Sequence, residues 1–224
     1  MFTSHAVELS EVALVNESLF NNLADDIYSK GYSVLPNALP SYLADGLYQY
    51  LQVMPEQKFD SAGTGRDDLH IVNQFVRTDE ICWINGDTEI GTAWLKWTYE
   101  LQQYLNRRLF LGLFSFESHF AHYAPGDFYK THLDAFKGEA NRVLSVVVYL
   151  NPQWNLDDGG ELVIYLPSDT DVAQVKVTPS FATIVAFLSE DFPHEVLPAT
   201  RDRYSIAGWY RLNTSQKDRV DPPK

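Results

Sequence analysis

Apolar residues recur at helical spacing in the first half of the chain. Between residues 17 and 30 they lie three and four positions apart on one face, and Gly31 closes the segment, which predicts a helix. The same spacing predicts two further helices, at residues 40–53 and 89–107, and a short apolar run at 32–35 predicts a strand. We therefore expect the first half of the chain to be mainly helical.

After Leu111 the pattern changes to short runs rich in Val, Ile, Phe and Tyr, separated by turn residues. Six or more runs at this spacing are typical of a sandwich, barrel or jelly roll rather than of βαβ units. They span residues 114–123, 142–151, 160–166, 173–179, 182–188 and 203–212. The sequence therefore predicts an α+β fold in which helices pack against a β-core.

The domain organisation follows from the absence of an internal repeat or a low-complexity linker between the two halves. We predict one domain over residues 1–224. About residues 1–111 would supply helical support and a loop at 61–68, about residues 112–213 the β-core, and residues 214–224 a frayed tail.

Composition and charge exclude several classes of partner. The formal net charge of −13 disfavours nucleic acid and anionic membranes, because an acidic surface repels phosphate groups. Glu8 and Glu11 lie where a signal peptide needs positive charge, and no apolar run reaches the roughly 20 residues that span a bilayer. Cys82 is the only cysteine, which excludes an intrachain disulfide. We expect a cytoplasmic protein.

An H-x-D tripeptide from His132 to Asp134, with His194 62 residues after the first histidine, carries the clearest chemical pattern. Alternate residues of a strand point to one face, so the first two side chains should aim at one point. Two histidines and one carboxylate leave open coordination positions and suit Fe(II) that activates oxygen. An H-x-D tripeptide also arises by chance, so it needs support from its surroundings. The other pair, His119 and His122, should lie on opposite faces of a strand and is excluded from the site.

Arg203 supplies that support. It begins an apolar strand nine residues after His194, and Ser205 shares its face. A buried arginine needs an anion, because an unpaired buried charge is costly. The anion is either a protein carboxylate in an ordinary salt bridge or the distal carboxylate of 2-oxoglutarate. The iron pattern next to it favours 2-oxoglutarate.

Several segments resemble the prolyl-hydroxylase branch of the Fe(II)/2-oxoglutarate dioxygenases. They are HYAPGDFYKTHLD, RVLSVVVYLNPQW, GGELVIY and PHEVLPATRDRYSIAGWYR, with VRTDEICWING upstream. The resemblance covers about residues 62–212 and is greatest to bacterial members, which are related to the animal oxygen-sensing prolyl hydroxylases. It implies a double-stranded β-helix, or jelly-roll, core with N-terminal supporting helices.

The resemblance also implies roles for individual residues. The implied Fe(II) ligands are His132, Asp134 and His194. The implied contacts of 2-oxoglutarate are Arg203, Tyr149, Tyr123, Trp209 and Leu162. The implied substrate-side residues are Tyr129, Arg142, Asp79 and Trp83. No catalytic residue is implied beyond the metal ligands.

The implied activity is that of a prolyl 4-hydroxylase that uses Fe(II), 2-oxoglutarate and O2, with ascorbate as a supporting reductant, and forms succinate and CO2. The implied partner is a polypeptide with a target proline, such as elongation factor Tu. The segment between Asp134 and Arg142 differs in composition from the animal enzymes, which leaves this partner open. Two alternatives remain: an oxygenase of a small metabolite or free amino acid, and a non-catalytic sensor of metal or 2-oxoglutarate.

Overall fold

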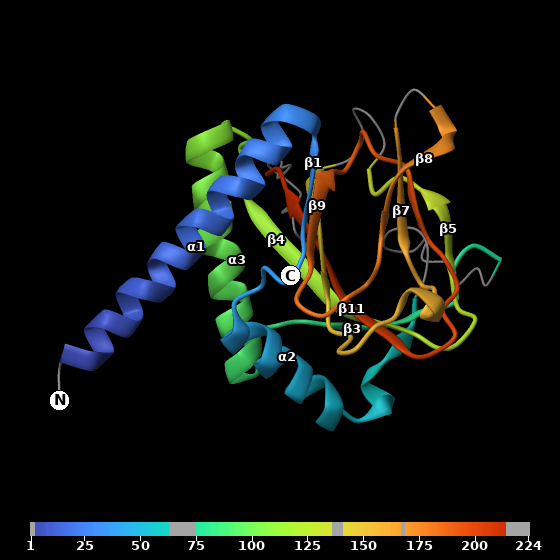
Figure 1. The fold of residues 1–224 in the computed structure, drawn as a ribbon, viewed down its shortest axis with the longest axis horizontal. Helices are drawn as coiled ribbons and strands as arrows, with labels where there is room; N and C mark the ends of the chain where they lie inside the picture. Colours follow the sequence, from blue (N-terminus) through green and yellow to red (C-terminus); the bar gives the residue numbers. More distant parts are fainter. Residues whose placement is uncertain (1–2, 63–74, 136–140, 167–168, 214–224) are drawn as a thin grey trace, which may run out of the picture.

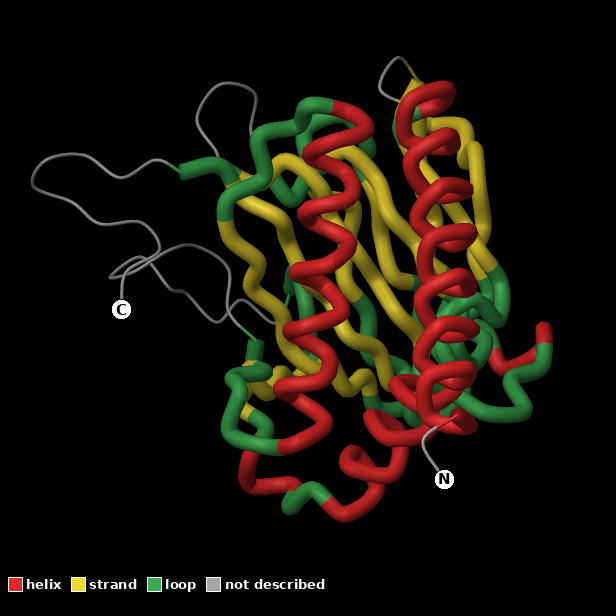
Figure 2. The backbone as a smooth tube through the Cα atoms, turned by 90° about the vertical axis from the view of Figure 1, so that its left-hand side faces the viewer, coloured by secondary structure: helices red, strands yellow, loops and turns green. Residues whose placement is uncertain are grey.

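The helices of the protein lie on one side of two facing β-sheets (Figure 1). The computed structural model describes residues 3–62, 75–135, 141–166 and 169–213. Its helices are α1 (Thr3–Lys30), α2 (Ser41–Val53) and α3 (Glu89–Leu109). Figure 2 shows α1 and α3 running side by side across the larger sheet.

All three helices were predicted, and local chemistry explains both ends of α3. α1 begins at Thr3, well before the predicted start near residue 17. The Thr88 side chain accepts a hydrogen bond from the Gly91 backbone N–H and caps the start of α3. Phe110 adopts the left-handed conformation that ends α3. None of the described helices is long and apolar enough to cross a membrane.

The strands form two antiparallel sheets in the described residues. The larger sheet has the order β1-β9-β6-β11-β4-β3-β2, and the smaller has the order β5-β10-β7-β8. The bounds are β1 Tyr32–Leu35, β2 Asp60–Ser61, β3 Glu80–Trp83, β4 Ser115–Tyr123, β5 Tyr129–His132, β6 Arg142–Tyr149, β7 Leu162–Leu166, β8 Asp169–Val177, β9 Ile184–Leu188, β10 His194–Val196 and β11 Arg203–Arg211. Two short 3-10 turns occupy Glu56–Lys58 and Leu156–Asp158.

The predicted α+β class with a jelly-roll core is confirmed. The six long apolar runs correspond to β4, β6, β7, β8, β9 and β11. The loop predicted at 61–68 lies outside the described residues except for its first two, of which Ser61 belongs to β2. The tail predicted at 214–224 also lies outside them. The single-domain organisation over residues 1–224 stays a prediction.

The larger sheet has two different faces. One face packs on the helices, with Ile206 and Tyr210 of β11 in the same apolar cluster as Trp94 and Trp97 of α3. The other face packs on the smaller sheet, where Tyr149 belongs to a second cluster. Because alternate residues of a strand point to opposite faces, alternate side chains of β11 face the helices and the smaller sheet. The candidate site lies on the second face.

Candidate metal and cosubstrate site

The three predicted metal ligands meet where β5 and β10 lie side by side. His132 ends β5 and lies directly opposite His194, the first residue of β10. The Asp134 carboxylate oxygens lie 3.6 Å from His132 Nε2 and 3.8 Å from His194 Nε2. One ligand atom from each residue lies within 4.8 Å of the other two. The three side chains could therefore share one metal ion.

Asp134 reaches this point by a route that differs from the prediction. β5 ends at His132, and Asp134 lies in a bend beyond the strand. The expectation that strand alternation alone aligns these two side chains was wrong. Because β10 begins at His194, the chain beyond His132 has no β10 partner and is free to turn. The bend, and not the strand, directs the carboxylate at the two imidazoles.

Both imidazoles are held in the tautomer that binds metal through Nε2. His132 Nδ1 lies 2.8 Å from the Lys130 carbonyl oxygen, and His194 Nδ1 lies 3.0 Å from the Phe192 carbonyl oxygen. A carbonyl oxygen only accepts hydrogen bonds, so each Nδ1 carries the proton. The Nε2 lone pairs are then free to coordinate, as in many metal-bound histidines.

The charge states of the triad suit a divalent cation. Burial alone would raise the pKa of Asp134, but His194, His132 and the Ser145 hydroxyl hold it well below its usual range. Ser145 Oγ donates to the Asp134 carboxylate at 2.6 Å and lies 2.9 Å from Ser189 Oγ. Burial, with a contribution from His132, lowers the pKa of His194 to about 4. Two imidazoles and one carboxylate favour Fe(II) with open positions.

Arg203 lies at the other end of the site as a buried cation. Arg203 is only 1% exposed to solvent. Its Nε donates to the Gly160 carbonyl oxygen at 2.8 Å and its Nη1 to Ser205 Oγ at 3.3 Å. Its guanidinium lies 4.9 Å from the Tyr123 ring and 5.1 Å from the Tyr149 ring. Among the described residues no carboxylate pairs with it, which disfavours the ordinary salt bridge.

Two further buried donors, one beside Arg203 and one further along β11, also lack an acceptor. The Tyr149 hydroxyl and Trp209 Nε1 are buried and form no hydrogen bond to any described residue. Burial raises the pKa of Tyr149 to about 12, against the opposing effect of Arg203, so the hydroxyl keeps its proton. Buried donors without acceptors are costly, so the Tyr149 hydroxyl beside the buried Arg203 marks a site for an anionic ligand. Trp209 lies opposite Ser145, toward the metal-ligand candidates. A dicarboxylate such as 2-oxoglutarate fits these donors.

The other two predicted cosubstrate residues lie in the same apolar cluster. Tyr123 pairs in register with Arg203, and Leu162 of β7 is 2% exposed. Both belong with Tyr149 to the cluster between the two sheets. They place apolar surface beside Arg203. An apolar, low-dielectric environment strengthens the electrostatic interactions of the guanidinium.

Asp79 and Tyr129 lie in a cluster built around Arg77, which sequence reasoning missed. Asp79 is buried and accepts two hydrogen bonds from Arg77, at 2.7 and 2.5 Å. The Arg77 guanidinium lies 4.4 Å from the Tyr129 ring, and that ring stacks on His132 with centroids 3.5 Å apart. Asp79 is therefore linked to His132 through Arg77 and Tyr129. The spacing of Arg77 two positions before Asp79 was a signal that could have found it.

Arg142 and Trp83 each lie against an aromatic ring of the larger sheet. Trp83 is 53% exposed, and its ring meets the buried His119 edge-on at 5.2 Å. Arg142 lies 3.8 Å from the Trp209 ring and donates to Glu117. Sequence reasoning did not place Glu117 next to Arg142 or His119 next to Trp83.

The prediction that His119 and His122 lie on opposite faces of a strand is confirmed. His119 faces Trp83 and Trp209, whereas His122 stacks on Tyr204 and contacts Phe59. The two imidazoles therefore lie on opposite faces of β4, as the strand period requires. Neither belongs to a metal-binding group among the described residues.

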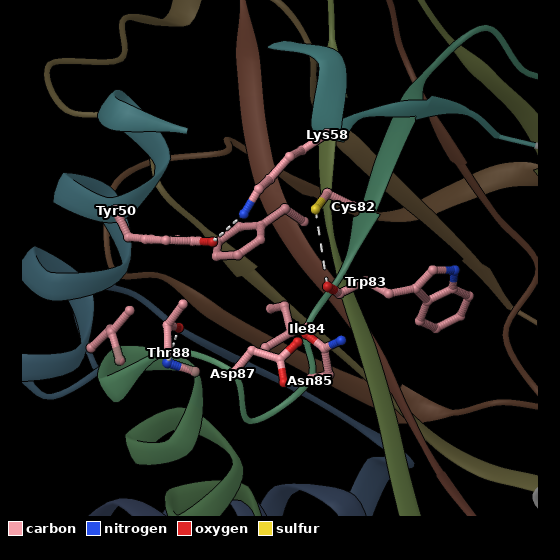
Figure 3. Close-up of a pocket in the computed structure, with 11 residues that line it drawn as sticks. Tyr50, Lys58, Cys82, Trp83, Ile84, Asn85, Asp87 and Thr88 are labelled. Atoms are coloured by element: carbon pink, nitrogen blue, oxygen red, sulfur yellow. Dashed lines mark hydrogen bonds between the residues drawn. The ribbon is translucent and has the colours of Figure 1, made fainter. Parts of the chain in front are cut away.

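A separate cavity of about 230 Å³ lies between α2, the start of α3 and β3 (Figure 3). Lys58 and Tyr50 line it, with their Nζ and hydroxyl 3.4 Å apart, and Cys82 lines it from β3. Figure 3 shows the Trp83 indole pointing away from these side chains. None of the three metal-binding candidates lines this cavity, so it is distinct from the site.

A jelly roll with a two-histidine-one-carboxylate triad and a buried unpaired arginine defines a class of protein. The family model of the 2OG-Fe(II) oxygenase superfamily matches residues 118–211, which include the triad and Arg203. Members of this class use Fe(II), 2-oxoglutarate and O2. The predicted cofactors are therefore those of the class.

Solved structures and curated relatives narrow the class. A prolyl-4-hydroxylase of Pseudomonas putida is 37% identical, with a TM-score of 0.76 over 87% of this chain and 98% of that chain. A prolyl hydroxylase of Trichoplax adhaerens, solved with a peptide fragment of hypoxia inducible factor, is 30% identical, with a TM-score of 0.75 over 88% and 90%. The hypoxia-inducible factor prolyl hydroxylase of Caenorhabditis elegans is 26% identical over 69% of this chain.

The chain belongs to the prolyl hydroxylase family of the 2OG-Fe(II) oxygenases. It spans 22% of the length of the nematode relative and between 20% and 25% of the length of the rat, mouse and human Egl nine homolog 1 proteins. The similarity to these curated relatives is therefore that of one part of a longer protein.

Proposed function

We propose that this chain is an Fe(II)- and 2-oxoglutarate-dependent prolyl 4-hydroxylase that acts on a proline within a polypeptide. One observation carries the proposal: a His-Asp-His triad and a buried arginine that no described carboxylate neutralises border the same cluster between the sheets, through Phe187 and Tyr149. The triad accounts for a metal, and the arginine accounts for an anionic cosubstrate. A sensor that only binds would not need a triad with open positions for further ligands.

In this proposal His132 and His194 bind Fe(II) through Nε2, and Asp134 binds it through the carboxylate. Arg203 and the Tyr149 hydroxyl hold the distal carboxylate of 2-oxoglutarate. Bound iron and 2-oxoglutarate supply the oxidative chemistry, in which 2-oxoglutarate and O2 yield succinate, CO2 and one hydroxyl group on the substrate. The protein orients both and excludes water from the space between the sheets.

The remaining predicted residues take supporting roles. Tyr123, Trp209 and Leu162 wall the cosubstrate. Tyr129 and Arg142 border the entry of the polypeptide, and both lie next to groups of the triad or its wall. Asp79 positions this side through Arg77, and the exposed ring of Trp83 offers apolar surface to the polypeptide. No general base among the side chains is needed.

The polypeptide substrate that we propose is elongation factor Tu. Support for a polypeptide comes from the Trichoplax relative, whose structure contains a hypoxia inducible factor fragment. The chain's resemblance to bacterial family members favours elongation factor Tu within that class. This proposal places the reaction in the cytoplasm, where that factor acts.

The test is mass spectrometry of elongation factor Tu after incubation with the protein, Fe(II), 2-oxoglutarate and ascorbate. We expect one added oxygen on one proline, and none with the control His132→Ala. Succinate formed without that modification would point to another substrate, such as a small metabolite or a free amino acid. If wild-type protein loaded with Fe(II) forms no succinate with any substrate, the enzymatic proposal is wrong and the sensor alternative takes its place.

A further inference from the structure

Glu117 lies between two arginines at one edge of the site. Its Oε1 accepts hydrogen bonds from Arg142 Nε at 3.1 Å and Nη2 at 2.8 Å. Its Oε2 accepts one from Arg211 Nη1 at 3.1 Å. The side chains of all three residues are at least partly buried, with 26%, 23% and 8% of their surface exposed in the order Glu117, Arg142 and Arg211. One carboxylate thus serves two guanidinium groups where water screens them little.

The position of Glu117 is set by strand pairing. Glu117 of β4 lies opposite Trp209 of β11, and Arg211, two residues further along β11, lies opposite Arg142 of β6. The three strands therefore bring both arginines to the same carboxylate, and all of these groups share the sheet face that carries the site.

Arg142 connects this ion network to the site. Its guanidinium lies 3.8 Å from the centre of the Trp209 ring, closer than the 4.4 Å between Arg77 and the Tyr129 ring. Trp209 in turn pairs in register with Ser145, whose hydroxyl donates to the Asp134 carboxylate. A continuous line of neighbours thus runs from Glu117 through Arg142 and Trp209 to a metal-ligand candidate.

Stacking alone holds a guanidinium weakly, because the arginine stem has many rotamers. The two hydrogen bonds to one carboxylate oxygen fix the plane of the Arg142 guanidinium against the indole. Without the negative charge of Glu117, Arg142 and Arg211 would repel each other, and Arg142, with the more exposed side chain, would move away. The Trp209 ring would then lose the group that covers it.

We propose that Glu117 is a positioning residue, which holds Arg142 flat on Trp209 and thereby fixes the indole wall of the 2-oxoglutarate site. This inference rests on the proposed function for the identity of the ligand, but its structural part does not. The expected consequence is a lower affinity for 2-oxoglutarate when Glu117 loses its charge. A cation–π contact corresponds to about three- to tenfold in an equilibrium constant, which sets the size of the effect.

The test compares Glu117→Gln with wild type and with Asp25→Asn. Asp25 pairs with Arg108 at 3.0 Å on the exposed surface, so its variant removes an acid–arginine pair outside the site. The first readout is the charge-transfer absorbance of Fe(II)-loaded protein titrated with 2-oxoglutarate without O2. We expect the dissociation constant for 2-oxoglutarate to rise about three- to tenfold in Glu117→Gln and to stay unchanged in the control. Glu117→Asp, which keeps the charge, should recover part of the loss.

A second readout needs neither metal nor cosubstrate. In the metal-free protein, the Trp209 Nε1–H resonance, assigned with Trp209→Phe, should shift and broaden in Glu117→Gln but not in Asp25→Asn. If that resonance and the affinity are both unchanged in a folded variant, the proposal is wrong. If wild type itself binds no 2-oxoglutarate, the proposed function fails, and the resonance alone decides whether Glu117 positions Trp209.

Discussion

Replacing Arg203 by methionine should separate cosubstrate binding from folding. The guanidinium contributes charge-assisted hydrogen bonds to Gly160 and Ser205, of about 1.5–3 kcal/mol each, and two contacts with tyrosine rings, of about 0.5–2 kcal/mol each. Against these stands the desolvation of a buried cation, which costs several kcal/mol. We expect the unliganded free energy of unfolding to change by less than about 2 kcal/mol, because these terms oppose each other.

The liganded protein should behave differently. Ligand at 100 times its dissociation constant stabilises a folded protein by about 2.7 kcal/mol. For a chain of this length that corresponds to about 5–11 °C in the unfolding midpoint. With redox-inert Mn(II) present, 2-oxoglutarate should therefore shift the midpoint of wild type by this amount and leave that of Arg203→Met unchanged.

Thermal unfolding followed by circular dichroism, with and without 2-oxoglutarate, measures both quantities. The matched control is Arg201→Met, two residues away, because the Arg201 side chain is 45% exposed and pairs with Asp158 at 3.6 Å. It should keep the full ligand-induced shift. A retained shift in Arg203→Met would refute the assignment of the cosubstrate carboxylate to this arginine. A loss of more than about 4 kcal/mol without ligand would make Arg203 a structural residue instead.

Three further variants or conditions test the surroundings of the triad. Ser145→Ala removes a 2.6 Å hydrogen bond to the metal-site carboxylate and should weaken Mn(II) binding about 10- to 100-fold by calorimetry, whereas an unchanged affinity would contradict that role. Asp79→Asn removes the bidentate partner of Arg77 and should cost about 3–5 kcal/mol in urea unfolding; a cost below about 1 kcal/mol would mean that the pair contributes little. Burial lowers the pKa of His194 to about 4 and of His119 to about 3, so the unfolded chain binds more protons and the metal-free protein should lose about 2 kcal/mol between pH 6 and 5. His119→Gln should lose about half as much over that interval, and an equal loss would remove His119 from the explanation.

Long apolar periods allowed most of the secondary structure to be predicted. Residues 17–30, 40–53 and 89–107 repeat every three or four positions, and α1, α2 and α3 include nearly all of them. The four residues of β5 and the three of β10 are too short to carry a period of two. Their strand character comes from pairing, because β10 lies between β5 and β7.

The candidate metal ligands and the anion-binding arginine could be predicted, because the residue types themselves indicate their chemistry. Two histidines, a carboxylate and an arginine at the start of an apolar strand indicated the ligands, and the structure brings the first three together. The partners that orient them could not be predicted in the same way, since Ser145 meets Asp134 and Glu117 meets Arg142 only across strand pairings. Register decides such contacts, and one residue of slip would turn each side chain to the other face.

The two faces of the larger sheet explain why helices are needed on only one side of it. On the helix side, β11 presents Ile206 and Tyr210 to an apolar core, and the Tyr210 hydroxyl donates to the Thr98 carbonyl oxygen. On the site side, the same strand presents Arg203 and Trp209, whose charge and indole N–H have no full set of partners in the described residues. A strand can hold such unsatisfied groups only if its other face is packed firmly enough to offset their cost. Packing of the helices therefore stabilises a strand whose site face carries donors without protein acceptors. A substitution on the site face of β11 should for this reason change the affinity for the cosubstrate more than the free energy of unfolding.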